Sequence, residues 1–216
     1  MIAWAVLDSK TGALMHEDGE RVVPAASTIK LFVYSAFRRS QLDPAEVVGA
    51  ANTGGSGVAE YLETPLSLAD HAFLMLAVSD NASTNILLDR LGFELIADEL
   101  DRLELERTRV RRKMMTAGPE NETTAVDLAT GLSRLVKEPF AEDMLRALRV
   151  AADSESFLPH LLPDATVAAK SGELDTVRHE VAYIELSDRR LVTAVCSSPP
   201  VTPDVLAQTA VSKLGV

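Results

Sequence analysis

The chain has 216 residues, of which 47% are hydrophobic, so it can bury a sizeable core and suits one domain or two lobes that share a core. Its 32 acidic residues outnumber the 21 basic ones, and the net charge of -11 argues against a nucleic-acid surface, which needs clustered Lys and Arg. No stretch approaches the roughly 20 uninterrupted apolar residues of a membrane span, and the start lacks the features of a secretion signal. The sequence as given is therefore expected to be soluble, without a membrane partner, and cytoplasmic, or extracytoplasmic if an upstream leader was trimmed.

Alternating hydrophobic residues at the start of the chain predict a β-hairpin. Its strands, residues 2–8 and 13–19, flank the turn-forming sequence SKTG, and a short third strand is expected at 21–24. The middle of the chain is then mostly helical, because apolar residues recur there every three or four positions. The expected helices include one that begins at Ser27 and others at about 68–78, 82–92, 94–103, 123–138 and 141–152.

Local signals mark the ends of two of these helices. Gly92 is expected to close one of them, because glycine adopts the backbone conformation that ends a helix. Thr124 and Asp127 are expected to form a capping box at the start of another.

The period of the apolar residues changes again near residue 165. Three strands, at 166–172, 177–186 and 191–198, are expected to precede a last helix at 202–214. Strands at both ends with helices between them predict an α+β fold, with one five-stranded antiparallel sheet built from both termini and flanked by helices. We expect a single domain over residues 1–216, with a sheet lobe at about 1–26 and 164–216 and an inserted, all-helical lobe at about 27–163.

Lys30 stands in a run of apolar and aromatic residues, three positions after Ser27. Residues three apart lie on the same face of a helix, so the amine and the hydroxyl are expected to be neighbours. A partly desolvated amine loses its proton more readily, and it can then act as the general base for a nucleophilic serine. The alternative is an ordinary capping serine and a lysine whose ammonium reaches solvent, and the spacing alone does not separate the two.

Two further motifs follow in the chain. The sequence SDN, residues 79–81, stands between two predicted helices, and KSG, residues 170–172, stands on the first strand after the helical segment. Each also has a structural reading, as turn and N-cap residues or as a strand end. All three motifs in this order are far rarer by chance than any one of them.

With STIK, SDN and KSG in this order, the sequence resembles the penicillin-recognising serine enzymes, which include class A β-lactamases, penicillin-binding proteins and transpeptidase-like enzymes. The resemblance includes the opening hairpin, the segment 77–92, the helix start at 123–124 and the hairpin after KSG, so it covers nearly the whole chain. It implies a β-lactamase/transpeptidase-like fold and a serine hydrolase that forms an acyl-enzyme with a β-lactam or a related amide.

The resemblance implies catalytic roles for five matching residues. Ser27 would be the nucleophile and Lys30 its general base. Ser79 would pass a proton to the leaving nitrogen, and Lys170 would tune the hydrogen bonding of Ser79. The backbone N–H of Ser27, together with that of Glu173, would form the oxyanion hole.

The resemblance also implies substrate-binding residues. Asn81 would hold the substrate amide, and Lys170, Ser171 and the adjoining Gly172 would line the place of a substrate carboxylate. Arg178 is a further candidate, because a guanidinium suits a carboxylate, but it belongs to no diagnostic motif and a structural role is the alternative.

The sequence departs from class A β-lactamases in the loop that carries the deacylating glutamate. The family pattern there is Arg-x-Glu with an asparagine four residues later, and the alignment puts Arg112 on the arginine but Met114 on the glutamate. A thioether takes no proton at neutral pH, so deacylation is expected to be slow unless Glu120, Glu122 or another carboxylate replaces the missing base. KSG also has serine where the family more often has threonine, which keeps the hydroxyl.

Two alternative functions stay open beside a β-lactamase. One is a peptidase, amidase or esterase that acts on D-amino-acid termini or small esters, and the other is a penicillin-binding sensor module in which lasting acylation is the signal. In each case the expected partner is a small molecule, namely a β-lactam, a peptide or an ester.

Other residues that often carry chemistry have structural interpretations. No metal ion or organic cofactor is expected, because the histidines at 16, 71, 160 and 179 show no ligand spacing. Cys196 is the single cysteine, so no intrachain disulfide is possible, and we expect it in a buried strand. The basic segment 107–113 is expected to be a solvated or salt-bridged loop.

Overall fold

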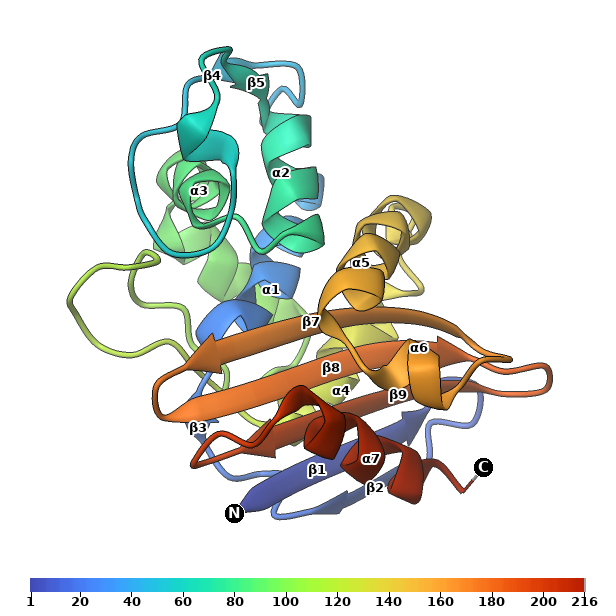
Figure 1. The fold of residues 1–216 in the computed structure, drawn as a ribbon. Coiled ribbons are helices and arrows are strands. Elements are labelled where there is room, and N and C mark those ends of the chain that lie inside the picture. Colours follow the sequence, from blue (N-terminus) through green and yellow to red (C-terminus); the bar gives the residue numbers. More distant parts are fainter. Residues whose placement is uncertain (216) are drawn as a thin grey trace.

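One five-stranded antiparallel sheet forms the base of the protein in the computed structural model, which describes residues 1–215 (Figure 1). The strands lie in the order β2-β1-β9-β8-β7, so that strands from the two ends of the chain are neighbours. Their bounds are β1 (Ile2–Asp8), β2 (Leu14–Glu17), β7 (Thr166–Leu174), β8 (Val177–Glu185) and β9 (Arg190–Ser197). The predicted α+β fold and its five-stranded sheet are confirmed.

Helices cover both faces of this sheet. Alternate residues of a strand point to opposite faces, and in β9 Val192, Ala194 and Cys196 belong to the larger apolar core, whereas Leu191 and Val195 belong to the smaller one. The larger core lies beneath α4 (Ala125–Leu135) and the helical segment, and the smaller one beneath α7 (Pro203–Leu214) (Figure 1). The buried position expected for Cys196 is confirmed.

The helical segment stands beyond the β7 edge of the sheet (Figure 1). Its centre is α1 (Lys30–Arg39), in which every residue from Lys30 to Phe37 is buried. The other helices are η1 (Ala26–Ile29), η2 (Ala59–Tyr61), α2 (Leu68–Ala77), α3 (Asn81–Arg102), α5 (Ala141–Glu155) and α6 (Leu158–Leu161). Two small two-stranded sheets join β3 (Val23–Pro24) with β6 (Glu122–Thr123) and β4 (Val47–Val48) with β5 (Leu66–Ser67).

Several local predictions need correction. The helix expected to begin at Ser27 starts as a 3-10 turn, and α1 proper begins at Lys30. The strand expected at 21–24 is reduced to two residues, and it pairs with β6 rather than joining the main sheet. The two helices expected at 82–92 and 94–103 form the single element α3, in which Gly92 interrupts the helical conformation with φ 73°.

Only one of the two hydrogen bonds of the capping box predicted for α4 is present. Thr124 accepts a 2.9 Å hydrogen bond from the backbone N of Asp127. The Asp127 carboxylate instead accepts bonds from the Arg107 backbone N and the Thr108 hydroxyl, so it fastens a neighbouring loop to the helix.

The prediction for the basic segment 107–113 is confirmed, since four of its side chains form ion pairs: Arg107–Glu20, Arg111–Glu122, Arg112–Glu120 and Lys113–Asp89.

Within residues 1–215, no helix combines the length and the hydropathy that crossing a bilayer requires.

Candidate active site

Ser27 lies in the turn through which the chain enters α1. The preceding residue, Ala26, has φ 49°, a left-handed backbone conformation that alanine rarely adopts. The turn packs so closely on β7 that a Cβ atom added to Gly172 would lie 3.0 Å from the backbone N of Ser27. The glycine of KSG therefore allows the turn and the edge strand to touch, and this contact fixes the position of the serine.

Lys30 joins two of the three motifs. Its side chain is fully buried, and Nζ lies 2.9 Å from Ser27 Oγ, 3.0 Å from Ser79 Oγ, 2.8 Å from the Ser79 carbonyl oxygen and 2.8 Å from Asn81 Oδ1. Two of these four partners are hydroxyls, which can donate as well as accept, and the lone pair of a neutral amine can take a proton from such a hydroxyl. The geometry thus suits an amine that exchanges protons with the two serine hydroxyls.

The surroundings of Lys30 favour its neutral form. Burial holds the pKa of Lys30 well below its usual value, and the positive charge of Lys170 lowers this pKa further. The negative charges of Asp80 and Glu155 oppose both effects. Burial dominates, so the amine is more readily available as a base than an exposed lysine would be.

The SDN motif forms the turn between α2 and α3. Ser79 has φ 55°, and the next residue, Asp80, caps α3 by accepting a 2.7 Å bond from the Ser83 backbone N. The second oxygen of Asp80 accepts bonds of 2.6 and 2.8 Å from the backbone N atoms of Val58 and Ala59. Burial raises the pKa of Asp80, but these N–H donors outweigh it and lower the pKa overall. An ionised Asp80 therefore holds the loop before α2 against the turn that presents Ser79.

Lys170 lies on the edge strand β7, as predicted, and is fully buried. Its Nζ donates a 3.0 Å bond to the Ser171 carbonyl oxygen and lies 3.9 Å from Glu155 Oε2. Burial lowers the pKa of Lys170 to about 8, although Glu155 and Glu180 act in the opposite direction. Two buried lysines thus lie near one another, and each has a lowered pKa.

A cavity of about 300 Å³ opens beside these groups. Its walls come from all three motifs and from the strand that follows KSG: they include Ser27, Ser79, Ser171, Gly172, Glu173 and Arg178. The structure therefore brings the predicted site residues from distant parts of the chain to one cleft, with the buried side chains of Lys30, Asn81 and Lys170 around it.

Two residues beside the cleft are already engaged. Arg178 forms an ion pair with the carboxylate of Glu173. His179 is buried, and its Nε2 lies 2.7 Å from the carbonyl oxygen of Pro24, so its ring ties β8 to the segment before Ser27. Burial lowers the pKa of His179. This histidine is a structural neighbour of the site.

The loop that contains Met114 is held by hydrogen bonds to α3 and by an ion pair of its own. Asn85 accepts a 2.8 Å hydrogen bond from the backbone N of Met114 and donates a 3.1 Å hydrogen bond to the carbonyl oxygen of Met114. Glu120 forms a two-pronged ion pair with Arg112, at 2.7 and 2.8 Å. Neither Glu120 nor Glu122 lines the cavity that holds Ser27.

Among the cavity residues that the sequence reasoning missed are Ser56, Glu155 and Glu180. Glu155 is the last residue of α5, which runs three positions beyond its predicted end. Glu180 lies opposite Ser171 in the pairing of β8 with β7, because β7 continues to Leu174, two residues beyond its predicted end, and Leu174 pairs with Val177. No sequence signal marks Ser56. Within residues 1–215, no group of three or more His, Cys, Asp or Glu residues is arranged to hold a metal ion.

Solved structures with this fold are known. The chain is similar to a β-lactamase from Sphaerobacter thermophilus DSM 20745, with 24% identity, a TM-score of 0.87, and 97% of this chain and 87% of that one covered. It is similar to PBP-A with 24% identity, a TM-score of 0.82 and the same coverage. A β-lactamase from Xanthomonas campestris pv. campestris shows 19% identity, a TM-score of 0.86, and coverage of 97% and 89%. Among curated proteins, none matches the sequence.

These likenesses define the fold as that shared by β-lactamases and PBP-A. The chain belongs to the beta-lactamase enzyme family, whose profile matches residues 1–215. Membership in this family supports a hydrolase.

Proposed function

We propose that the protein is a serine acyl-hydrolase of the β-lactamase type, which forms an acyl-enzyme on Ser27 with a β-lactam or a related amide. One observation carries the proposal: the buried amine of Lys30 lies between two hydroxyls, 2.9 Å from that of Ser27 and 3.0 Å from that of Ser79. A base must lie within hydrogen-bond reach of the proton that it removes, and Lys30 meets this requirement for both serines.

Acylation then proceeds by three proton transfers. Neutral Lys30 takes the proton of Ser27 as Oγ forms a bond to the substrate carbonyl carbon, and the backbone N–H groups of Ser27 and Glu173 stabilise the oxyanion. When the C–N bond breaks, Ser79 gives its proton to the leaving nitrogen and regains one from Lys30. The amine ends the step neutral, and Lys170 supplies positive charge beside it.

Substrate binding falls to the side chains on the two walls of the cleft. Asn81 accepts from Lys30 through Oδ1 and donates to the Gly54 carbonyl oxygen through Nδ2 at 3.2 Å, which leaves one N–H for the substrate amide. Ser171 and Gly172 present the opposite wall, with Arg178 further along it.

Hydrolysis of the acyl-enzyme is proposed to be slow. The position of the usual deacylating glutamate is held by Met114, and the nearby Glu120 is paired with Arg112. Without a positioned base, water attacks the ester of Ser27 less readily. A PBP-A mutant described as an acyl-enzyme complex with penicillin G has the same fold, which supports the formation of such an adduct here.

Intact-protein mass spectrometry after mixing with penicillin G tests the proposal. We expect the protein mass to rise by one penicillin, with the adduct on Ser27 by peptide mapping. The control is Ser27→Ala, which should give no adduct while its thermal melting stays close to that of the wild type. Neither adduct nor product from the wild type would reject the proposal.

The missing base also favours two alternatives, and the lifetime of the adduct separates them. An adduct that lasts for hours favours a penicillin sensor. Background turnover of nitrocefin, combined with hydrolysis of a D-Ala-D-Ala peptide or a p-nitrophenyl ester, favours a peptidase or an esterase.

A further inference from the structure

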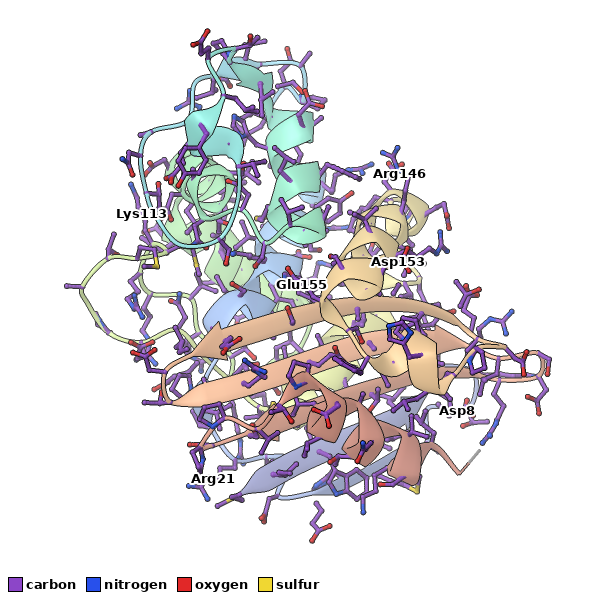
Figure 2. All side chains as sticks on the ribbon, in the orientation of Figure 1. Asp8, Arg21, Lys113, Arg146, Asp153 and Glu155 are labelled. Carbon is purple, nitrogen blue, oxygen red and sulfur yellow. The ribbon has the colours of Figure 1, made fainter. Side chains whose placement is uncertain are left out.

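The carboxylate-binding end of the cleft already contains a carboxylate of the protein itself. Glu155 accepts a hydrogen bond from the Ser171 hydroxyl, and its Oε2 lies 3.9 Å from Lys170 Nζ. Its side chain is about one third exposed and lines the cavity. Figure 2 shows Glu155 where the end of α5 meets β7.

This contact uses the groups that would otherwise receive a substrate carboxylate. A serine hydroxyl has a single proton, so Ser171 cannot donate it both to Glu155 and to a ligand. Lys170 is fully buried, and Glu155 supplies the nearby negative charge that balances its ammonium. A substrate carboxylate placed here would have to displace Glu155 or stand beside a like charge.

The positive charge of Arg178, like that of Lys170, is balanced by a nearby carboxylate. Arg178 is paired with Glu173, and both line the same cavity. A third carboxyl, that of Glu180, lies opposite Ser171 across the two strands. The charge of Lys170 is thus paired with that of Glu155, and the charge of Arg178 with that of Glu173. This end of the cleft therefore has no excess positive charge to attract an anion.

We propose that Glu155 makes the site prefer substrates whose terminal group at this end is uncharged, such as a carboxamide or an ester, over substrates that end in a carboxylate, which react more slowly. The inference rests on the proposed acylation of Ser27 and adds the substrate class. An uncharged amide or ester can accept hydrogen bonds from the strand without bringing a second negative charge, whereas an anion meets a like charge and loses the Ser171 donor.

Two thioesters that differ only in this terminal group provide the test. N-benzoylglycyl thioglycolamide ends in a carboxamide, and N-benzoylglycyl thioglycolate ends in a carboxylate. The second-order rate constant of Ser27 acylation is measured from thiol release and from the mass of the adduct. We expect the wild type to favour the carboxamide by about tenfold or more, as one unfavourable like-charge contact implies.

The variant Glu155→Gln keeps the size of the side chain and removes its charge. We expect it to reduce the preference for the carboxamide by about tenfold, mainly through faster acylation by the carboxylate compound. The matched control is Asp153→Asn, which removes a charge from the same helix end; Asp153 points to the other side of α5 (Figure 2) and lies outside the cavity. It should leave the preference unchanged.

An uncharged fluorophosphonate probe separates failure of this inference from failure of the proposed function. If neither the probe nor either thioester modifies Ser27, the proposed function is rejected. If the probe modifies Ser27 in the wild type and in Glu155→Gln, three results overturn the inference alone. They are no acylation by either thioester, equal or faster acylation by the carboxylate compound in the wild type, and a preference unchanged by Glu155→Gln.

Discussion

Lys30 and Asn81 are joined by a 2.8 Å hydrogen bond from Nζ to Oδ1 beside the cleft. The bond is one of four short contacts that hold the amine between the turn of Ser27 and the turn of Ser79. An amine held in this way is aimed at both hydroxyls without needing to reorganise, which is the condition for efficient proton transfer.

Replacing Lys30 with alanine should lower the rate of Ser27 acylation by about two to four orders of magnitude, because a positioned general base contributes that much. The rate of penicillin G adduct formation, followed by mass spectrometry, measures the effect. Circular dichroism of the variant checks that the fold is retained. Acylation at the wild-type rate in a folded variant would mean that another group removes the proton.

The rate of acylation should have a bell-shaped dependence on pH. Burial lowers the pKa of Lys30, so the rate rises with pH as this amine becomes neutral. Lys170 has a pKa of about 8 and is charged below that value, so the rate should fall above about pH 8 as its positive charge is lost. Rate constants for adduct formation between pH 5 and 10 give the profile.

Lys170→Arg tests which group causes the falling limb. Arginine stays charged over this range, so the fall above about pH 8 should disappear in the variant. A wild-type rate that keeps rising to pH 10 would contradict the assignment to Lys170.

Glu180 should make the protein less stable as the pH rises. Burial raises the pKa of its carboxyl from 4.5 to about 7, and Glu155 adds to this effect. The native state therefore binds more protons than the unfolded state between these two values, and the free energy of unfolding falls as the pH rises through this window. Glu180→Gln should remove a fall of up to about 3 kcal/mol, measured by urea unfolding at pH 4 and pH 8. An equal fall in wild type and variant would place its origin elsewhere.

Met114→Glu should shorten the life of the acyl-enzyme. A carboxylate at this position would supply the missing base, and we expect deacylation to accelerate by about tenfold or more. The decay of the penicillin G adduct, followed by mass spectrometry, measures the change. Met114→Gln has nearly the same shape without a base and serves as the control. Equal adduct lifetimes in the two variants would show that position 114 is not aimed at the ester.

Much of the fold could be predicted because the hydrophobic period changes where the structure changes. The strands that follow residue 165 alternate between two apolar cores, and this burial on both faces is visible in the sequence as near-continuous apolar runs. The short β3 was overestimated because Val22 and Val23 suggest a strand, although only two residues there find a partner. Local preference does not reveal which segment will pair with which.

The site was only partly predictable for a similar reason. Ser27, Lys30 and Ser79 belong to motifs whose spacing carries chemical meaning, and the structure brings them together. Glu155 belongs to no motif, and it reaches the cleft because α5 continues three residues further than its apolar period suggests. Helix ends are set by tertiary contacts as well as by local sequence, so such a residue becomes visible only in three dimensions.

The pairing of β1 with β9 has a consequence for how the protein is made. Ile2 lies opposite Ser197, so the first strand has no partner in the sheet until residue 197 has left the ribosome. The lowered pKa of Lys30 likewise depends on folding, because in an unfolded chain water surrounds its ammonium. We therefore expect the reactivity of Ser27 to appear only when the chain folds.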